Sequence, residues 1–530
     1  MSVNHRPNIL LILVDELRAR RPYDPTLRLP AQERLRAQGL SLDCHYTAAT
    51  ACAPSRTSLF TGHYPSLHGV SQTDGMAKRA ADVTWLGPDT VPTLGHYLSA
   101  AGYRTYYRGK WHVSHADLLD AKGAPIATND KGGNVLPQGV AAYAAADPLL
   151  PYGFSGWIGP EPHGADPANT GYVRDPLFAD QVVEQLARLG DGNKQDAQPF
   201  FLVASLVNPH DIAVYSQMWS TAWGFPWPDD TVPPVPPPPT ADEDLTEKPR
   251  CQKDYVDKYW RMLLPQVTIE RYRRFYYWLQ LLVDKQVERI LDALARAGLR
   301  ESTLVMYTSD HGDMLGAHGG MHQKWHNAYE ETIHVPFIIS NPLRFPTAMQ
   351  TSRLTSHIDL APTLLSLAGV DAAKAEEQLR ASHRVVRPLV GRDLSALMQA
   401  EAVAAPPPEH EESVYFMSDD QVSDGGSWLE FGALKLPYRP VIQPGYVETV
   451  VARLPAEPTA ELWKYSRYFD GRAGERKKPA DEFELYCLAD DPLEQRNLVV
   501  SAHATPRSER ARARLDELLK RYRKDVRIGG

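Results

Sequence analysis

Residues 8–15 read NILLILVD, and this short stretch decides the fold class. Six consecutive apolar residues, from Ile9 to Val14, end at the carboxylate of Asp15. A continuous apolar run rich in branched side chains is typical of a strand that is buried on both faces, as in a parallel sheet. In open α/β sheets, ligands collect beyond the carboxyl ends of the strands, so Asp15 is a candidate functional residue.

The same pattern occurs twice more along the chain. Residues 199–207, PFFLVASLV, are followed by Asn-Pro-His, which ends at His210. Residues 303–307, TLVMY, are followed by Thr-Ser-Asp-His, which ends with Asp310 and His311. Because the carboxyl ends of parallel strands lie at one edge of a sheet, we expect these side chains to gather there.

A segment with the apolar pattern of a helix lies between the second and third of these strands. Apolar residues recur at helical intervals from Leu279 to Leu294, and Gly298 predicts the end of that helix. Alternation of strands and helices favours an α/β fold with a large, mostly parallel central sheet sandwiched by helices. Two segments are expected to be loops: residues 117–175 show no sustained period, and residues 225–239 carry VPPVPPPP, which favours an extended polyproline conformation.

The length of 530 residues predicts two unequal domains. We expect a catalytic α/β domain over residues 1–400, then a linker that contains AVAAPPPEHEE at residues 402–412. Residues 410–530 are expected to form a smaller α+β domain with a short antiparallel sheet. Its predicted elements include a strand at residues 413–417, SVYFM, and a basic helix from Ser508 to Lys524.

Composition excludes several classes of protein. With 43% hydrophobic and 23% charged residues, the chain is neither disordered nor fibrous. A net charge of −8 gives no general attraction for nucleic acid or anionic lipid. The first apolar run is too short for an export signal or a membrane span, and four scattered cysteines make no disulfide framework. We therefore expect a cytoplasmic protein, and a homo-oligomer is left open.

The most specific motif is CAPSRTSLFTG at residues 52–62. It resembles the signature of the type I sulfatases, the formylglycine-dependent, arylsulfatase-like hydrolases of the alkaline phosphatase superfamily. The resemblance implies an alkaline phosphatase-like fold and a maturation enzyme that oxidises Cys52 to formylglycine, with Pro54 and Arg56 as part of its recognition sequence. Without these flanking residues, a buried structural thiol would be the favoured interpretation of Cys52.

The resemblance also implies a mechanism for the modified Cys52. A hydrated aldehyde carries two hydroxyls on one carbon, of which one attacks sulfur and the other is later deprotonated, so that the aldehyde reforms and expels sulfate. This is covalent catalysis that divides one difficult step into two easier ones.

A second motif, GYRTYYRGKWH at residues 102–112, is similar to another signature of this family. By resemblance, Lys110 contacts the sulfate group and His112 lies against the nucleophile. Lysine supplies a point charge for a developing anion, and histidine can transfer a proton near neutral pH. Outside such a motif, a lysine and a histidine on a loop are more often surface residues.

The resemblance places one divalent metal ion on Asp15, Asp310, His311 and the formylglycine made from Cys52. Imidazole suits transition metals better than calcium, so His311 makes Mn²⁺ a candidate beside Ca²⁺. This chain has Glu16 where many members of the family carry a second aspartate. The longer side chain leaves three alternatives: direct ligation, ligation through water, or no role at the metal.

Two further basic residues match the family pattern. By resemblance, His210 reaches the bridging oxygen of the substrate as general acid, and Lys324 is a second contact to the sulfate. The nearby His318, His322 and His326 are expected to be pocket wall or surface, because no cysteine or carboxylate has a spacing that suits zinc.

The resemblance extends through SHIDLAPTLLSLAGV at residues 356–370 and ELYCLADDPLEQRNL at residues 484–498, and so spans nearly the whole chain. It predicts a hydrolase of sulfate monoesters, with aryl sulfates as the expected substrates. Two alternatives stay open: a phosphonate monoester or phosphate diester hydrolase of the same superfamily, and a catalytically silent anion-binding homologue. Tryptophans are candidates for an aryl pocket or for ordinary packing, namely Trp111, Trp157, Trp219, Trp223 and Trp325.

Overall fold

The structure is a computed structural model of the whole chain. It describes residues 6–527 except 76–77, 79–81, 163, 165, 193–197, 216–230, 261–269, 400–411, 423–427, 432–433, 438–439, 457–458 and 473–476.

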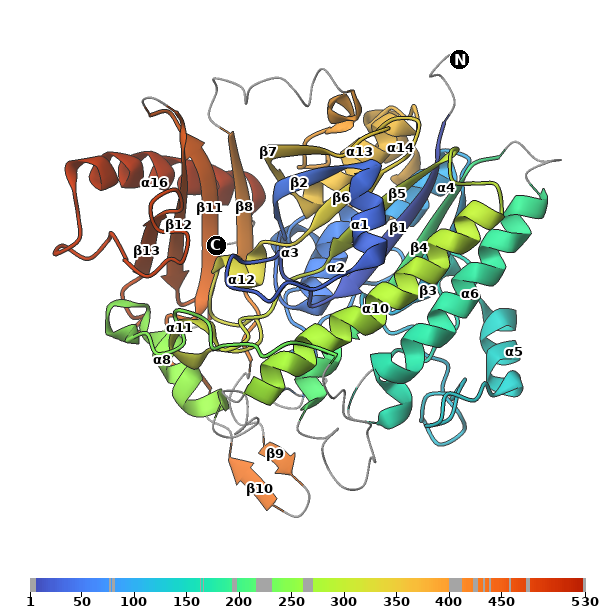
Figure 1. Cartoon of the computed structure of the whole chain (residues 1–530), viewed down its shortest axis with the longest axis horizontal. Helices are drawn as coiled ribbons and strands as arrows, with labels where there is room; N and C mark the ends of the chain where they lie inside the picture. Colours follow the sequence, from blue (N-terminus) through green and yellow to red (C-terminus); the bar gives the residue numbers. More distant parts are fainter. Residues whose placement is uncertain are drawn as a thin grey trace.

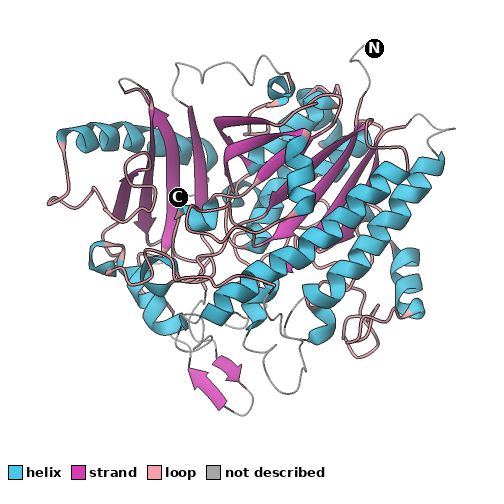
Figure 2. Ribbon diagram, in the orientation of Figure 1, coloured by secondary structure: helices cyan, strands magenta, loops and turns pink. Residues whose placement is uncertain are grey.

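A seven-stranded sheet lies at the centre of the molecule (Figures 1 and 2), with strand order β3-β4-β1-β5-β6-β2-β7. Strand β6 is antiparallel to its neighbours β5 and β2, and the other pairs are parallel. This confirms the predicted mostly parallel sheet. The strands are β1 (Asn8–Asp15), β2 (Gly39–Tyr46), β3 (Arg104–Gly109), β4 (Phe200–Pro209), β5 (Thr303–Ser309), β6 (Phe337–Ser340) and β7 (Met349–Ser356).

Helices cover both faces of this sheet, and β1 shows how the two layers form. Ile9, Leu11 and Leu13 pack into one hydrophobic core, while the alternate residues pack into another on the opposite face. The first core contains residues of α2, α4 and α13, and the second contains residues of α1, α6 and α10. The helices are α1 (Pro30–Ala37), α2 (Cys52–Thr61), α3 (Pro65–His68), α4 (Leu94–Ala100), α5 (Pro137–Ala146), α6 (Gly171–Gly192), α8 (Arg250–Tyr255), α10 (Glu270–Arg296), α11 (Ala317–Gly320), α12 (Glu330–Ile333), α13 (Leu360–Leu367), α14 (Ala372–Leu379) and α16 (Pro506–Val526).

The three apolar runs that the sequence singles out are adjacent strands, in the order β4-β1-β5. In the register of β1 and β5, Val14 lies opposite Ser309, so the next residue of each strand is an aspartate, Asp15 or Asp310. On the other side of β1, Asp15 lies opposite Pro209. The predicted gathering of polar residues at one sheet edge is therefore confirmed.

A second, antiparallel sheet of four strands in the order β13-β12-β11-β8 lies in the C-terminal region, with α16 against it (Figure 1). Its core also contains Ala48, Tyr64 and Ile358, which come from the N-terminal part of the chain. Residues 402–411 of the predicted linker lie outside the described residues, and its last residue, Glu412, begins β8. The strands of the C-terminal region are β8 (Glu412–Ser418), β9 (Trp428–Phe431), β10 (Leu434–Pro437), β11 (Tyr446–Leu454), β12 (Glu461–Phe469) and β13 (Glu482–Cys487).

Local predictions met different outcomes. Helix α10 ends as expected: Gly298 has a φ of 70°, and the N–H of Leu299 returns to the carbonyl of Leu294 at 3.1 Å. The segment 117–175 was wrongly predicted as loop throughout, because it contains α5. That helix is rich in alanine, begins with Pro137 and buries few of its side chains, so propensity and not apolar period specifies it.

The other loop prediction is only partly described. Residues 225–230 of the proline-rich segment lie outside the described residues, and residues 233–238 adopt no regular structure. Among the described helices, none combines the length and hydropathy that crossing a bilayer requires.

Candidate active site

Cys52 is the first residue of α2, so its side chain lies at the positive end of that helix dipole. Every residue of α2 is buried, and Cys52 is 3% exposed. Pro54 is tolerated because the N–H groups of the first helical turn have no partner within the helix. The hydroxyl of Ser55 donates to the carbonyl of Asp310 at 2.5 Å, which fixes α2 against the end of β5.

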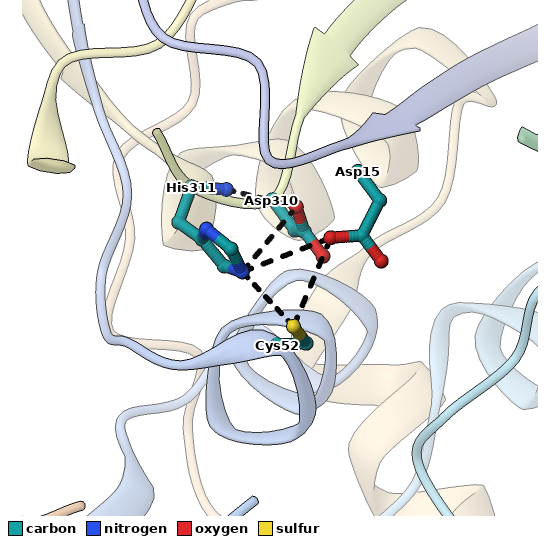
Figure 3. A group of neighbouring side chains, drawn as sticks. All are labelled: Asp15, Cys52, Asp310 and His311. Atoms are coloured by element: carbon teal, nitrogen blue, oxygen red, sulfur yellow. Dashed lines mark hydrogen bonds and ion pairs between the residues drawn. The ribbon is translucent and has the colours of Figure 1, made fainter. Parts of the chain in front are cut away.

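Four buried side chains converge at this helix terminus (Figure 3): Asp15, Cys52, Asp310 and His311. One ligand-type atom from each lies within 4.8 Å of the other three. The Sγ atom of Cys52 is 3.0 Å from Nε2 of His311 and 3.7 Å from Oδ1 of Asp15. The predicted metal ligands therefore form one cluster.

The orientation of His311 suits a metal ligand. Its Nδ1 lies 3.0 Å from the carbonyl oxygen of Gly312. Because a carbonyl cannot donate, Nδ1 must carry a proton in this hydrogen bond, and in the neutral imidazole Nε2 has a lone pair directed at the cluster. The oxygen Oδ1 of Asp310 accepts from the backbone N–H groups of Glu16 and His311, at 3.0 Å each, which fixes this carboxylate.

Arg56 joins the two aspartates. Its guanidinium donates to Asp310 at 2.8 Å and to Asp15 at 3.2 Å. Further donations at 2.9 Å reach the carbonyl of Lys110 and the hydroxyl of Ser205. Arg56 is fully buried, and its planar fork connects α2 to the ends of β1 and β5, to the residue after β3 and to Ser205 within β4.

Lys110 follows β3 and is also fully buried, with Nζ 2.5 Å from Oδ2 of Asp15. Burial raises the pKa of Asp15, but Lys110, His210 and Arg56 together outweigh it and hold the pKa of that carboxyl well below its usual range. A Cβ at Gly109 would lie 1.7 Å from the carbonyl oxygen of Ser205, so only glycine lets the chain approach β4 this closely.

Lys324 brings a third cation to the site. Its Nζ is 3.1 Å from Oε2 of Glu16. Glu16 is fully buried, and burial raises its pKa well above the usual range despite the neighbouring Lys324. We call the six charged residues the catalytic cluster: Asp15, Glu16, Asp310, Arg56, Lys110 and Lys324.

His210 lies at the start of a short 3₁₀ helix (His210–Val214) directly after β4. One of its ring nitrogens lies within 4.8 Å of carboxylate oxygens of Asp15 and Glu16. Two buried acids fix this part of the chain to α6. Asp211 accepts from the N–H groups of residues 171 and 172, and Asp175 accepts from those of residues 207 and 208.

His112 is positioned by different contacts. Its Nε2 lies 2.8 Å from Oδ1 of Asp74, and its ring centroid is 5.5 Å from that of Trp85. Between Lys110 and His112, Trp111 is buried among aromatic rings, including those of Phe60 and Phe154. This anchor directs the side chains on either side of it.

The remaining histidines and tryptophans are mainly packing residues. His318, His322 and His326 are all buried, so they are not surface residues. His318 stacks on Tyr329 with 3.7 Å between ring centroids, and its Nδ1 lies 2.7 Å from Glu243. Trp111 and Trp157 are core residues, Trp325 is half-buried 5.4 Å from Nζ of Lys324, and Trp219 and Trp223 lie outside the described residues.

Several residues that build this site were not predicted from the sequence. Ser205 lies within the buried strand β4, and the sequence indicates only that it is an interior residue of a strand. Asp74 belongs to no motif, although it holds His112. Asp313 follows the Asp-His pair by two residues and accepts the backbone N–H groups of Leu315 and Gln323, at 2.6 and 3.1 Å. Its place directly after the metal motif is the one signal that marks it.

Known proteins agree with this geometry. A sequence model of the sulfatase family matches residues 7–370. A choline-sulfatase of Rhizobium meliloti (strain 1021) is 27% identical over 376 residues, which cover 69% of this chain and 68% of the relative. An arylsulfatase of Volvox carteri is 27% identical over 390 residues, and the match covers 69% of this chain but 56% of that longer relative.

Solved structures share the fold over nearly the whole chain. A 2-O GAG sulfatase aligns with a TM-score of 0.64 and 21% identity, covering 99% of this chain and 94% of its own. A phosphonate monoester hydrolase of Agrobacterium radiobacter aligns with a TM-score of 0.61 and 21% identity, covering 98% and 96%. The family match shows that the chain belongs to the sulfatase family of hydrolases, and the solved structures agree in fold. Membership of this family supports activity on sulfate esters.

Proposed function

We propose that this protein hydrolyses sulfate monoesters, aryl sulfates among them, with a formylglycine derived from Cys52 and one divalent metal ion. The observation that carries the proposal is the position of Cys52. Its Sγ lies at the N-terminus of α2, in contact with His311 and Asp15. Arg56 and Lys110 both pair with the carboxylate of Asp15.

The thiol itself is a poor nucleophile. Burial, with a smaller contribution from Asp15, raises the pKa of Cys52 to about 12. Because the thiolate is the reactive form of cysteine, the unmodified side chain would be almost wholly protonated and inert at neutral pH. A hydrated aldehyde at the same position would supply a hydroxyl nucleophile on a carbon that can later expel sulfate.

The residues present fit a divalent cation. Asp15 and Asp310 supply hard oxygen donors, and His311 supplies Nε2 of its imidazole. Here Sγ of Cys52 stands in for the oxygen of the modified residue. When bound, the metal would supply positive charge beside the nucleophile and the transferred group. The imidazole supports Mn²⁺ beside Ca²⁺ as the proposed ion.

The remaining groups have roles that follow from their charge. Lys110 and Lys324 would bind the non-bridging oxygens of the sulfate and stabilise charge that develops on them. His210 would deliver a proton to the oxygen of the leaving alcohol. His112, held by Asp74, would accept the proton of the modified side chain when the aldehyde reforms.

Mass spectrometry of the peptide that contains Cys52 tests the proposal. Production together with a formylglycine-generating enzyme should replace the sulfur by oxygen and remove two hydrogens. The same preparation should hydrolyse members of a panel of aryl, sugar and alkyl sulfates. A fully unmodified Cys52 in a preparation with sulfatase activity would exclude the formylglycine mechanism. A modified protein that turns over no sulfate would favour the silent anion-binding alternative.

Phosphonate esters are a second substrate class that we propose to include in the panel. The match to a phosphonate monoester hydrolase over 98% of this chain shows that the same fold serves that chemistry. The family signature with Lys110 and His112 favours sulfate as the preferred group. A higher kcat/KM for a phosphonate than for every sulfate in the panel would reverse that order.

A further inference from the structure

A buried carboxylate of the C-terminal region reaches the catalytic half of the molecule. Asp420 lies two residues beyond β8 and is fully buried. Its Oδ2 accepts the backbone N–H groups of Ala51 at 3.3 Å and of Thr73 at 3.0 Å. Its Oδ1 pairs with the ammonium group of Lys78. Three donors from two separate segments of the N-terminal half therefore converge on one side chain.

The first of these segments leads directly into the nucleophile. Ala51 is the N-cap of α2, and it precedes Cys52. Pro54, the third residue of α2, has no side-chain acceptor that could reach back to the N–H of Ala51, so this N–H depends on an acceptor from elsewhere. Strand β8 holds the preceding residues as well: Ser418 donates to the carbonyl of Thr50 at 3.1 Å, and Met417 donates to that of Ala48 at 3.1 Å.

The second segment leads to the partner of His112. Thr73 precedes Asp74, whose Oδ1 lies 2.8 Å from Nε2 of His112. Gln72 fixes the same segment, because its Nε2 donates to the carbonyl of Asp419 at 2.6 Å and its Oε1 accepts the N–H of Gln421 at 3.2 Å. The residues on either side of Asp420 therefore hold the segment in the same orientation.

We propose that Asp420 is a positioning residue that sets the geometry between Cys52 and His112 by holding the residue before Cys52 and the residue before Asp74. A carboxylate suits this position because two oxygens can accept three donors, whereas an amide offers one accepting oxygen. The inference rests on the proposed function only in assuming that Cys52 and His112 act in one reaction. It assigns the C-terminal region a part in catalysis.

The first test compares Asp420→Asn with Asp419→Asn. Asp419 pairs with Arg527 at 2.9 Å through its side chain and contacts residue 72 only through its backbone, so its variant is a matched control. We expect Asp420→Asn to lower kcat by about tenfold or more with little change in KM, because small misplacements of reacting groups reduce turnover strongly. Asp419→Asn should keep the wild-type kcat. Mass spectrometry must show equal conversion of Cys52 in both proteins.

A double-mutant cycle separates positioning from a general structural role. If Asp420 acts through Asp74, the losses in kcat for Asp420→Asn and Asp74→Asn should be strongly non-additive. Additive losses, or a kcat for Asp420→Asn equal to that of the wild type, would overturn the proposal. Should Asp420→Asn fail to fold, Asp420→Glu keeps the charge, displaces it by one methylene and is expected to lower kcat in the same non-additive way.

Hydrogen exchange gives a readout that needs no turnover. Peptides that span residues 48–60 and 70–75 should exchange faster in Asp420→Asn than in Asp419→Asn. Unchanged exchange in both peptides would overturn the proposal even if kcat fell. If the wild type hydrolysed no sulfate, the proposed function would fail, whereas this comparison would still decide whether Asp420 holds the two segments.

Discussion

Two clusters of buried charges in this molecule use the same residue types in different ways. The junction cluster, defined as Arg21, Glu330, Glu331, Lys464 and Glu494, connects the region around α12 to the C-terminal sheet. Each of its acids has a donor closer than 3 Å: Lys464 is 2.8 Å from Glu330 and 2.9 Å from Glu494, and the hydroxyl of Tyr23 is 2.6 Å from Glu331.

The acids of the catalytic cluster are also paired with cations, but this cluster is arranged around one point. Its charges surround Cys52, and ligand-type atoms of Asp15, Asp310 and His311 lie within 4.8 Å of the Cys52 sulfur. Several ligand-type atoms that converge on one point are suited to a bound cation. Charges that neutralise one another indicate a structural role, and charges that converge indicate a binding site.

Removal of Cys52 gives the largest expected effect. Cys52→Ala should reduce turnover of a sulfate ester at least about a thousandfold, as expected when a covalent nucleophile is lost. The melting temperature should stay close to that of the wild type. Cys251→Ala, at another buried free cysteine, is the control and should keep the wild-type turnover per folded molecule. Substantial activity in Cys52→Ala would remove this residue from the mechanism.

Two lysine variants compare the clusters directly. Lys110→Ala should lower kcat by about 100- to 1000-fold, because it removes a cation beside the transferred group. This loss equals about 2.7 to 4 kcal/mol of transition-state stabilisation. Lys464→Ala should instead lower the free energy of unfolding by about 3 kcal/mol, because it leaves Glu330 and Glu494 buried without their cation. Steady-state kinetics and urea unfolding measure both variants. Similar profiles for the two lysines would contradict the distinction between the clusters.

Metal binding should stabilise the folded protein. After treatment with a chelator, Mn²⁺ at about 100 times its Kd should add about 2.7 kcal/mol to the free energy of unfolding. Asp310→Asn should largely abolish this increase, and His311→Asn should shift the preference toward Ca²⁺. Asp284→Asn, a buried acid that accepts the N–H groups of residues 31 and 32, is the matched control and should retain the full increase. Equal increases in all variants would place the ion elsewhere.

The pH dependence of stability gives the smallest effect. Burial raises the pKa of Glu494 from its ordinary value near 4.5 to about 7, although Lys464 opposes this shift. Between those values the folded protein binds more protons than the unfolded chain, so this carboxyl lowers stability as pH rises from about 4.5 to 7. Glu494→Gln should weaken that decline by less than about 1.4 kcal/mol per pH unit.

Urea unfolding at pH 5 and pH 7.5 measures this difference. Glu377→Gln, at an exposed helical position, should leave the pH dependence unchanged. A decline of the same steepness in Glu494→Gln and in the wild type would show that Glu494 does not titrate in this interval.

The central sheet and the cluster of candidate metal ligands could be predicted because both follow from local pattern. The runs that become β1, β4 and β5 are apolar throughout, and the side chains that follow them lie at one sheet edge in any parallel arrangement. The motif around Cys52 adds the candidate nucleophile. Together these signals identify Asp15, Asp310 and His311 without knowledge of strand order.

The supporting residues could not be predicted, because their roles arise from contacts between distant segments. Asp420 acts on Ala51 and Thr73, which precede it by more than 300 residues, and nothing in its neighbourhood marks it. Helix α5 was missed for another reason: alanine favours a helix through propensity, and this leaves no apolar period to detect.

The register of β1 against β5 has a consequence for how this protein tolerates change. Asp15 and Asp310 are neighbours because Val14 and Ser309 are paired, and that pairing is set by side chains that fill two cores. Deletion of a single residue within β1 would exchange its two faces and carry Asp15 away from its partner at the same time. The connecting segments can therefore vary in length, whereas β1, which ends at Asp15, must keep its length.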